Sequence, residues 1–447
     1  MRRLILCLLL VVPSLVLAKD PLNVVLIISD DQAWTDYGFM GHEVIKTPHL
    51  DRLASQSLLF TRGYVTTSLC RPSLATLATG LYPHQHGITG NDPAIPKGFR
   101  GRLRQNPQYL DLCEQVIEKI DRVPTLPRML WSKGYRSHQS GKWWEGHYSR
   151  GGFTEGMTHG DPSRGGRHGD RGLEVGRRGL KEVTDFIDRS IAAKKPYFVW
   201  YAPFLPHTPH NPPKRLLEKY KAKGRPQRLA KYYAMCEWFD ETCGALVEHV
   251  DKTSQKNNTL IVYVTDNGWI QRTPVSNVPK GWNQGFAPRS KQSPNDGGLR
   301  TPIFFRLPGK IQPKRDDTTL VSSLDIVPTI LAACGLEVPE SLPGIDILAT
   351  DRPKRDRIFG EVFAHDIANL SRPADSLLYR WCIEGNYKLI TTENGKIGRY
   401  TKVHPRTDRR PQLYDLSKDP HENKNLAGED KERVDAMMKA LNGWWRG

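Results

Sequence analysis

The sequence of 447 residues predicts an α/β protein with a large, mostly parallel sheet sandwiched by helices and a small C-terminal antiparallel sheet. Three apolar runs carry this prediction: Asn23 to Ser29, Pro196 to Ala202 and Thr259 to Thr265. Continuous β-branched and aromatic runs are typical of strands buried on both faces, as in a parallel sheet between helices. From Asp351 on, short strand patterns are punctuated by Gly and Asn, which indicates a separate antiparallel sheet.

The remaining elements follow from local patterns. Apolar spacing and capping residues predict helices at residues 47–54, 70–79, 125–133, 179–193, 229–250, 323–334 and 430–445. Further strands are expected at residues 135–143, 302–307, 358–363, 377–383 and 387–391. Two polar stretches lack strong periodicity: residues 91–123, expected to be an insertion near the active-site mouth, and the Gly- and Arg-rich residues 149–178, expected to be loop. We therefore predict a catalytic domain at 19–350 and a C-terminal subdomain at 351–447.

The N-terminus has the pattern of a secretory signal peptide. Arg2 and Arg3 precede a short apolar run that ends at Ala18, with small-residue spacing that suits cleavage after Ala18. The run is too short to span a membrane comfortably. We expect residues 1–18 to be removed and the chain to be exported, periplasmic or secreted, without an integral membrane span.

Composition narrows the class of partner. The formal net charge is +17, and the basic residues are scattered among Gly and Pro. This distribution favours a sulfated polysaccharide over nucleic acid, which would need basic residues gathered on one surface with aromatics. A solvated basic surface without any partner is the open alternative. Seven cysteines in a chain of this length exclude a dense disulfide scaffold, and Cys236 and Cys243 lie too far apart along one helix to bridge.

Acidic residues follow two of the predicted core strands. Asp30 and Asp31 come directly after the first strand, and Asp266 and Asn267 come directly after the strand 259–265. Ligands of open α/β sheets bind at the carboxyl ends of strands, and adjacent carboxylates repel unless a cation neutralises them. Carboxylate and amide oxygens are the donors that Ca²⁺ prefers. A helix cap or a solvated turn is the alternative for each pair taken alone.

A cysteine motif is the centre of the sequence. Cys70 to Gly80 reads CRPSLATLATG, which places a thiol on a proline-stiffened turn at a helix N-terminus, where anions bind. Without further context this would be a buried cysteine at a helix start. The segment resembles the sulfatase signature Cys-x-Pro-Ser-Arg, in which the cysteine is oxidised to formylglycine. Cys70, Pro72 and Ser73 match, whereas Leu74 stands where the family has arginine.

Three further segments are similar to sulfatase motifs. Gly141-Lys142-Trp143-Trp144 resembles a Gly-Lys-Trp-His run, with Trp144 in place of the histidine. The segment around His207 resembles Pro-His-x-Pro-His, and Lys291 precedes Asp296-Gly297-Gly298 as a family lysine precedes Glu-Gly-Gly. The similarity extends to Gln412–Ala427 near the C-terminus, so that it covers the chain from end to end.

The resemblance implies an alkaline-phosphatase-like fold with a mixed sheet and most of the family's site residues. Asp30, Asp31, Asp266, Asn267 and an oxygen of modified Cys70 would bind Ca²⁺. Lys142 and Lys291 would hold the sulfate, and His207 would protonate the leaving oxygen. The family's base is replaced by Trp144; His84, His86 and His147 are candidates by sequence proximity. Maturation would require a formylglycine-generating enzyme.

The expected function is therefore that of an exported, calcium-dependent sulfatase acting on a sulfated carbohydrate. Two alternatives stay open. The same scaffold suits a phosphomonoester or phosphodiester hydrolase, and the departures at Leu74 and Trp144 suit a catalytically silent glycan-binding relative.

Overall fold

The computed structural model describes residues 21–161, 165–404 and 409–447. The predicted signal peptide, residues 1–18, lies outside the described residues. In the described part of the chain, no helix combines the length and the apolar character that a membrane crossing requires.

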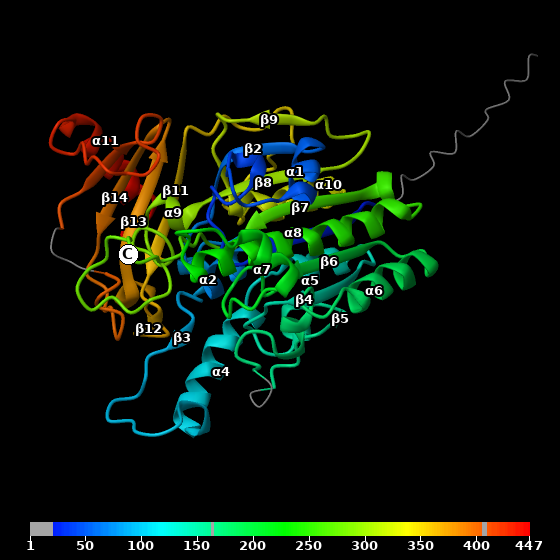
Figure 1. The fold of residues 1–447 in the computed structure, drawn as a ribbon, viewed down its shortest axis with the longest axis horizontal. Coiled ribbons are helices and arrows are strands. Elements are labelled where there is room, and N and C mark those ends of the chain that lie inside the picture. The colour runs from blue at the N-terminus through cyan, green and yellow to red at the C-terminus, as the bar shows by residue number, and fades with distance from the viewer. Residues whose placement is uncertain (1–20, 162–164, 405–408) are drawn as a thin grey trace, which may run out of the picture.

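The main sheet confirms the predicted fold class. Within the described residues it has nine strands in the order β10-β2-β8-β7-β1-β6-β4-β5, with β9 alongside β2 (Figure 1). Strand β8 is antiparallel to β2 and β7, and the other pairs are parallel, so the sheet is mixed but mostly parallel. The strands are β1 Asn23–Ser29, β2 Leu58–Tyr64, β4 Arg136–Gly141, β5 Glu155–Gly156, β6 Tyr197–Ala202, β7 Thr259–Thr265, β8 Arg300–Arg306, β9 Lys314–Asp316 and β10 Val321–Ser322.

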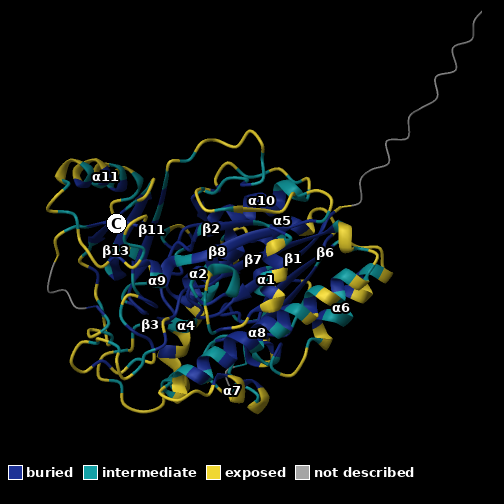
Figure 2. Ribbon diagram, turned by 45° about the horizontal axis from the view of Figure 1, so that its top comes forward, coloured by how far each residue is buried: buried dark blue, intermediate teal, exposed yellow. Residues whose placement is uncertain are grey.

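Helices cover both faces of this sheet because its central strands are apolar on both sides. Val24, Leu26 and Ile28 of β1 pack into one core, with helices α2, α4, α5 and α10. Val25 and Ile27 pack into the other, with α1, α6 and α8. In Figure 2 the strands are buried, whereas α6 is exposed along its outer side. The helices are α1 Pro48–Ser55, α2 Cys70–Thr79, α3 Pro83–His86, α4 Pro107–Asp121, α5 Leu126–Trp131, α6 Lys181–Ala192, α7 Lys214–Tyr220, α8 Gln227–Lys252, α9 Asp296–Leu299, α10 Ile326–Ala333 and α11 Lys431–Trp444.

The C-terminal part forms a second, antiparallel sheet at one end of the molecule, with α11 packed on it (Figure 1). Its strands are β11 Arg357–Phe363, β13 Leu377–Glu384, β14 Tyr387–Thr392 and β15 Gln412–Asp415, and a small pair joins β3 Asp92–Pro93 to β12 Asp366–Ile367. A buried ion cluster ties this part to the rest: Lys388 Nζ lies 2.8 Å from Asp296 Oδ1 and 2.9 Å from Glu422 Oε1. The domain boundary at residue 350 stays a prediction.

Residues 91–123 correct the sequence analysis. The stretch was expected to be irregular, but residues 107–121 form helix α4. Asn106 caps it by accepting a hydrogen bond from the Tyr109 N–H at 2.8 Å, and Val116 and Ile120 bury its inner side. Tyr109, Cys113, Val116 and Ile120 follow the helical period, so the sequence carried a signal for this helix that the sequence analysis overlooked. The described residues 149–161 and 165–178 are largely irregular as expected, apart from β5 and short 3₁₀ turns.

Candidate active site

The acidic residues meet because two neighbouring strands end together. Strands β1 and β7 are parallel, and Ser29 pairs with Thr265 in register, so Asp30-Asp31 and Asp266-Asn267 emerge at one edge of the sheet. The Asp31 N–H donates to Asp266 Oδ1 at 3.1 Å, and the Asn267 amide donates to Asp31 Oδ1 at 2.7 Å. Asp31 has a φ of 61°, a left-handed conformation that non-glycine residues rarely adopt and that often marks a functional site. Geometry therefore brings together all four residues predicted from the strand ends.

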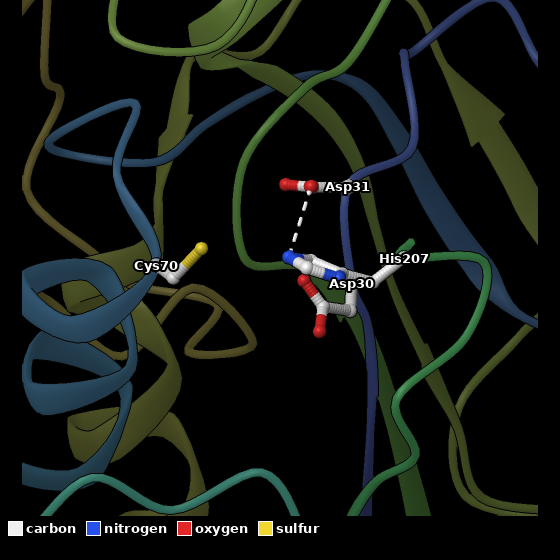
Figure 3. Close-up of side chains that lie close together, drawn as sticks. All are labelled: Asp30, Asp31, Cys70 and His207. Carbon is white, nitrogen blue, oxygen red and sulfur yellow. Dashed lines mark ion pairs between the residues drawn. The ribbon is translucent and has the colours of Figure 1, made fainter. Parts of the chain in front are cut away.

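Helix α2 places Cys70 beside these carboxylates. Ligand atoms of Asp30, Asp31, Cys70 and His207 all lie within 4.8 Å of one another, and Figure 3 shows the Cys70 thiol at the start of its helix on the side of Asp31. The helix is buried along its length and ends at Gly80, whose φ of 74° provides the left-handed cap. Burial raises the pKa of the Cys70 thiol to about 11. Cys70 itself is therefore protonated at neutral pH and is a weak nucleophile as a thiol.

Both predicted lysines contact the carboxylates that surround Cys70. Lys291 Nζ lies 2.6 and 2.8 Å from the two Asp31 oxygens and 3.0 Å from Cys70 Sγ. Lys142, directly after β4, places its Nζ 2.7 Å from Asp30 Oδ1 and 3.6 Å from Asp266 Oδ2. Burial opposes both ammonium charges, but the adjacent carboxylates outweigh it and raise the pKa of both lysines. Two buried cations thus stand beside the thiol.

His207 follows β6 on a proline-rich loop. Its Nε2 lies 3.4 Å from Asp31 Oδ2 (Figure 3), its Nδ1 donates to the Thr208 carbonyl at 2.6 Å, and its ring stacks on Phe204. Burial, together with Lys142 and Lys291, lowers the pKa of His207 well below its ordinary value. The Nδ1 hydrogen bond leaves Nε2 as the nitrogen that faces the centre of the site.

The donor set suits a hard cation. Within residues 21–161, 165–404 and 409–447, three buried oxygens have no hydrogen-bond partner: Asp30 Oδ2, Asp266 Oδ2 and Asn267 Oδ1. Burial and the neighbouring carboxylates raise the pKa of Asp30 despite the contact with Lys142, and burial is also the main cause of the raised pKa of Asp266. Unpaired, crowded carboxylate and amide oxygens of this kind are stabilised by an oxygen-seeking divalent ion. The site can therefore hold a metal ion.

Comparisons with known proteins identify the family. Residues 22–336 match the sulfatase family model. The chain belongs to the sulfatase family. Residues 290–443 of this sulfatase also match the model of the C-terminal part of N-sulphoglucosamine sulphohydrolase. Members of the family hydrolyse sulfate esters, so this sulfatase is a sulfuric ester hydrolase.

Curated relatives resemble this sulfatase over nearly its whole length. It is 27% identical to N-acetylgalactosamine-6-sulfatase of Homo sapiens, covering 94% of this chain and 84% of the relative. It is 23% identical to N-acetylgalactosamine-6-O-sulfatase of Bacteroides thetaiotaomicron, with 94% and 92% covered. Among solved structures, a Pseudoalteromonas sulfatase has a TM-score of 0.67 at 20% identity, with 94% and 89% covered. A phosphonate monoester hydrolase of Agrobacterium radiobacter has a TM-score of 0.68 at 18% identity, with 94% and 95% covered, so the fold is shared across two chemistries.

The two departures from the family motif have local explanations in this sulfatase. Leu74 is buried in the apolar core under α2, where it packs as an ordinary helix residue. Arg71 forms a buried double contact with Glu145, at 2.9 and 2.6 Å. Trp144 is buried beneath the Arg167 guanidinium, which lies 4.4 Å from its ring, and its indole N–H finds no partner in the described part of the chain. Leu74 does not supply the positive charge, and Trp144 does not supply the imidazole, that the family has at these two positions.

The histidines suggested as substitutes for Trp144 have other partners. His84 pairs with Glu361 at 2.8 Å, His86 lies 3.3 Å from the Thr76 hydroxyl, and His147 bonds to Ser149. Sequence analysis missed His168, whose ring lies 5.2 Å from that of Trp144 and 5.3 Å from that of Phe204. Phe204 in turn stacks on His207, so His168 borders the site through two aromatic contacts. Only the path of the irregular segment 149–178 brings it there, and no local motif could have shown this.

Proposed function

We propose that this sulfatase hydrolyses a sulfate ester on a carbohydrate, using Ca²⁺ and a formylglycine formed from Cys70. The main support is the triple contact of Lys291, which touches Cys70 Sγ and both oxygens of Asp31. A lysine so placed can bind an anion that forms or breaks a bond at position 70. Two relatives named for N-acetylgalactosamine 6-sulfate support a sugar substrate.

We assign sulfate binding, proton donation and metal binding to different residues of the chain. Lys142 and Lys291 hold the sulfate oxygens and absorb the charge that develops on them. His207 presents Nε2 to the leaving sugar oxygen and donates a proton to it there, once it has acquired that proton on substrate binding. Asp30, Asp31, Asp266 and Asn267 would hold the ion, with an oxygen from position 70 as a further ligand. Bound Ca²⁺ and the hydrated aldehyde would supply an activated oxygen nucleophile.

His168 is our proposed proton acceptor in place of the family histidine. Burial, with smaller contributions from Lys142 and Arg167, lowers its pKa to about 3. Its imidazole is therefore neutral at neutral pH but a weak base, so it can accept a proton only once the charge of the bound sulfate offsets Lys142 and Arg167. Its buried Nδ1 has no hydrogen-bond partner among the residues that the structure describes, so within that part of the chain the ring is not committed to a structural contact through that atom.

One experiment tests the central proposal. The protein is produced in its native host or together with a formylglycine-generating enzyme, and the mass of the peptide that contains Cys70 is measured. We expect the aldehyde and its hydrate, calcium in the purified protein, and turnover of an aryl sulfate well above that of the matching aryl phosphate. Faster phosphate turnover would favour the phosphoester hydrolase. Unmodified cysteine, together with glycan binding that is unchanged in Cys70→Ala, would favour the silent binder.

Export is part of the same proposal. Residues 1–18 would be removed, and the mature protein would be periplasmic or secreted. N-terminal sequencing of the mature protein should then begin at Lys19; recovery of a cytoplasmic protein that begins at Met1 would contradict this.

A further inference from the structure

A cavity of 420 Å³ lies beside the proposed sulfate site. Arg71, which directly follows Cys70, and Trp144, which follows Lys142 closely, both line it. Its volume falls within the range of about 300–1,000 Å³ that is typical of small-molecule sites. The two lysines already hold the position of the sulfate, so this space can accept another part of the substrate.

Among the described residues four arginines line the cavity, and carboxylates pair with three of them. Arg71 pairs with Glu145 at 2.6 Å. Arg167 forms a double contact with Asp92, with Nε at 2.7 Å from Oδ1. Arg399 pairs with Asp366 at 2.7 Å. These three arginines are held by carboxylates and help to shape the wall.

Arg104 differs from these three. Among the residues that the structure describes, it is the lining arginine without a carboxylate partner, and its side chain is exposed. It stands on the 3₁₀ turn Leu103–Gln105 just before α4. Within the described part of the chain, Arg104 is therefore a cation on the cavity wall that no carboxylate pairs with.

The rest of the lining suits a sugar. Tyr109, Trp144 and Tyr400 present aromatic rings, and Leu110 and Ile117 add apolar surface. The Arg167 guanidinium over Trp144 and the Arg399 guanidinium over Tyr400 hold two of these rings in place. Aromatic walls with a few fixed polar groups are typical of small-molecule sites.

We propose that this cavity binds a second anionic group of the substrate, a carboxylate or a second sulfate, with Arg104 as its counter-ion. The inference rests on the proposed function and adds a substrate class to it: sulfated saccharides that carry an additional negative charge near the ester. A contact between Arg104 and such a group would be charge-assisted, and because the side chain is exposed we expect a preference of about tenfold.

Binding to the protein with unmodified Cys70 tests this without turnover. Calorimetry compares two matched pairs of probes at fixed ionic strength. The carboxylate arm pairs N-acetylgalactosamine 6-sulfate with the disaccharide in which a uronic acid is attached to it. The sulfate arm pairs glucosamine 6-sulfate with glucosamine 2-N,6-O-disulfate. Arg104→Gln is compared with Arg102→Gln, a neighbouring exposed arginine on the same loop that does not line the cavity.

The expected result is that the doubly charged member of at least one pair binds about tenfold more tightly to the wild-type protein. Arg104→Gln should remove this preference, Arg102→Gln should keep it, and high salt should reduce it. The proposal fails if neither pair shows a preference, if Arg104→Gln keeps it, or if no probe binds. Turnover of an aryl sulfate by the modified wild-type enzyme, a substrate without a second anion, then shows whether the proposed function has failed as well.

Discussion

Calcium removal should weaken the binding of sulfate itself. Lys291 lies on Asp31 and Lys142 on Asp30, at contact distances of 2.6 to 2.8 Å. A sulfate ion must then compete with these carboxylates for the same two ammonium groups. Calcium would take over the carboxylate charge and leave the lysines available, so the two ligands should bind cooperatively.

The magnitude follows from the contacts that are exchanged. Each hydrogen bond to a charged group contributes about 1.5–3 kcal/mol to stability. If calcium frees the equivalent of one such contact, the coupling free energy is about 1.5–3 kcal/mol, or about 10- to 150-fold in the dissociation constant of sulfate. Reciprocity requires sulfate to tighten calcium binding by the same factor.

Calorimetric titration of sodium sulfate into the protein, with calcium chloride or with a chelator at constant ionic strength, measures this coupling. Lys291→Met should show weaker sulfate binding and a smaller calcium effect, and Asp266→Asn should weaken calcium binding while the circular dichroism spectrum is unchanged. Equal sulfate affinity with and without calcium would refute the reasoning. So would a calcium effect of full size in Lys291→Met, because the charge of the ion alone would then explain it.

The remaining predictions concern single side chains. His207→Gln should reduce kcat for a sugar sulfate by about 10²- to 10⁴-fold but have little effect on an aryl sulfate, whose leaving oxygen needs no proton; an equal loss on both substrates would indicate another role. The pKa of His207 is lowered, so little of this histidine is protonated at neutral pH and the protonated fraction grows as pH falls. We therefore expect kcat/KM for the sugar sulfate to increase toward acidic pH. A profile that rises toward alkaline pH would contradict this. Burial lowers the pKa of His138 from 6.5 to about 4, so its contribution to stability is complete above pH 6.5 and is lost as pH falls toward 4. At about 1.4 kcal/mol per pKa unit, the free energy of unfolding should fall by about 3 kcal/mol between these two pH values because of His138. Urea unfolding should show that the free energy of unfolding of His138→Leu falls less over this pH range than that of the wild type. Lys388→Met should cost about 3–5 kcal/mol by leaving Asp296 and Glu422 without their cation, whereas exposed Lys396→Met should cost almost nothing in the same assay.

The parts of the fold that depend on local pattern were predictable. The strands β1, β6 and β7 are continuous apolar runs, and burial on both faces follows from that composition. Strand β2 has no such signal, because Arg62 and Gly63 interrupt its apolar residues, and its antiparallel pairing with β8 depends on contacts far apart in the chain.

The same distinction between local pattern and long-range contact applies to the residues of the site. Asp30, Asp31, Asp266 and Asn267 follow core strands, so strand register alone brings them together. The positions of His168 and Arg104 depend on how two irregular segments fold back over α2 and α4, and nothing within those segments encodes the contact. The family motif likewise shows that a histidine is missing at Trp144 but not which side chain stands nearby.

The burial of Cys70 bears on the order of events during biogenesis. The residue is 1% exposed, and every residue of α2 around it is buried in the finished molecule. An enzyme that oxidises Cys70 must therefore reach it while the chain is still extended, before α2 packs against the sheet. Maturation and folding would then compete in time, and protein that folds first would be permanently inactive despite a native structure. A recombinant preparation would be a mixture of modified and unmodified protein, and its active fraction would depend on the relative rates of modification and folding. Specific activity should therefore be normalised to the aldehyde content and not to total protein.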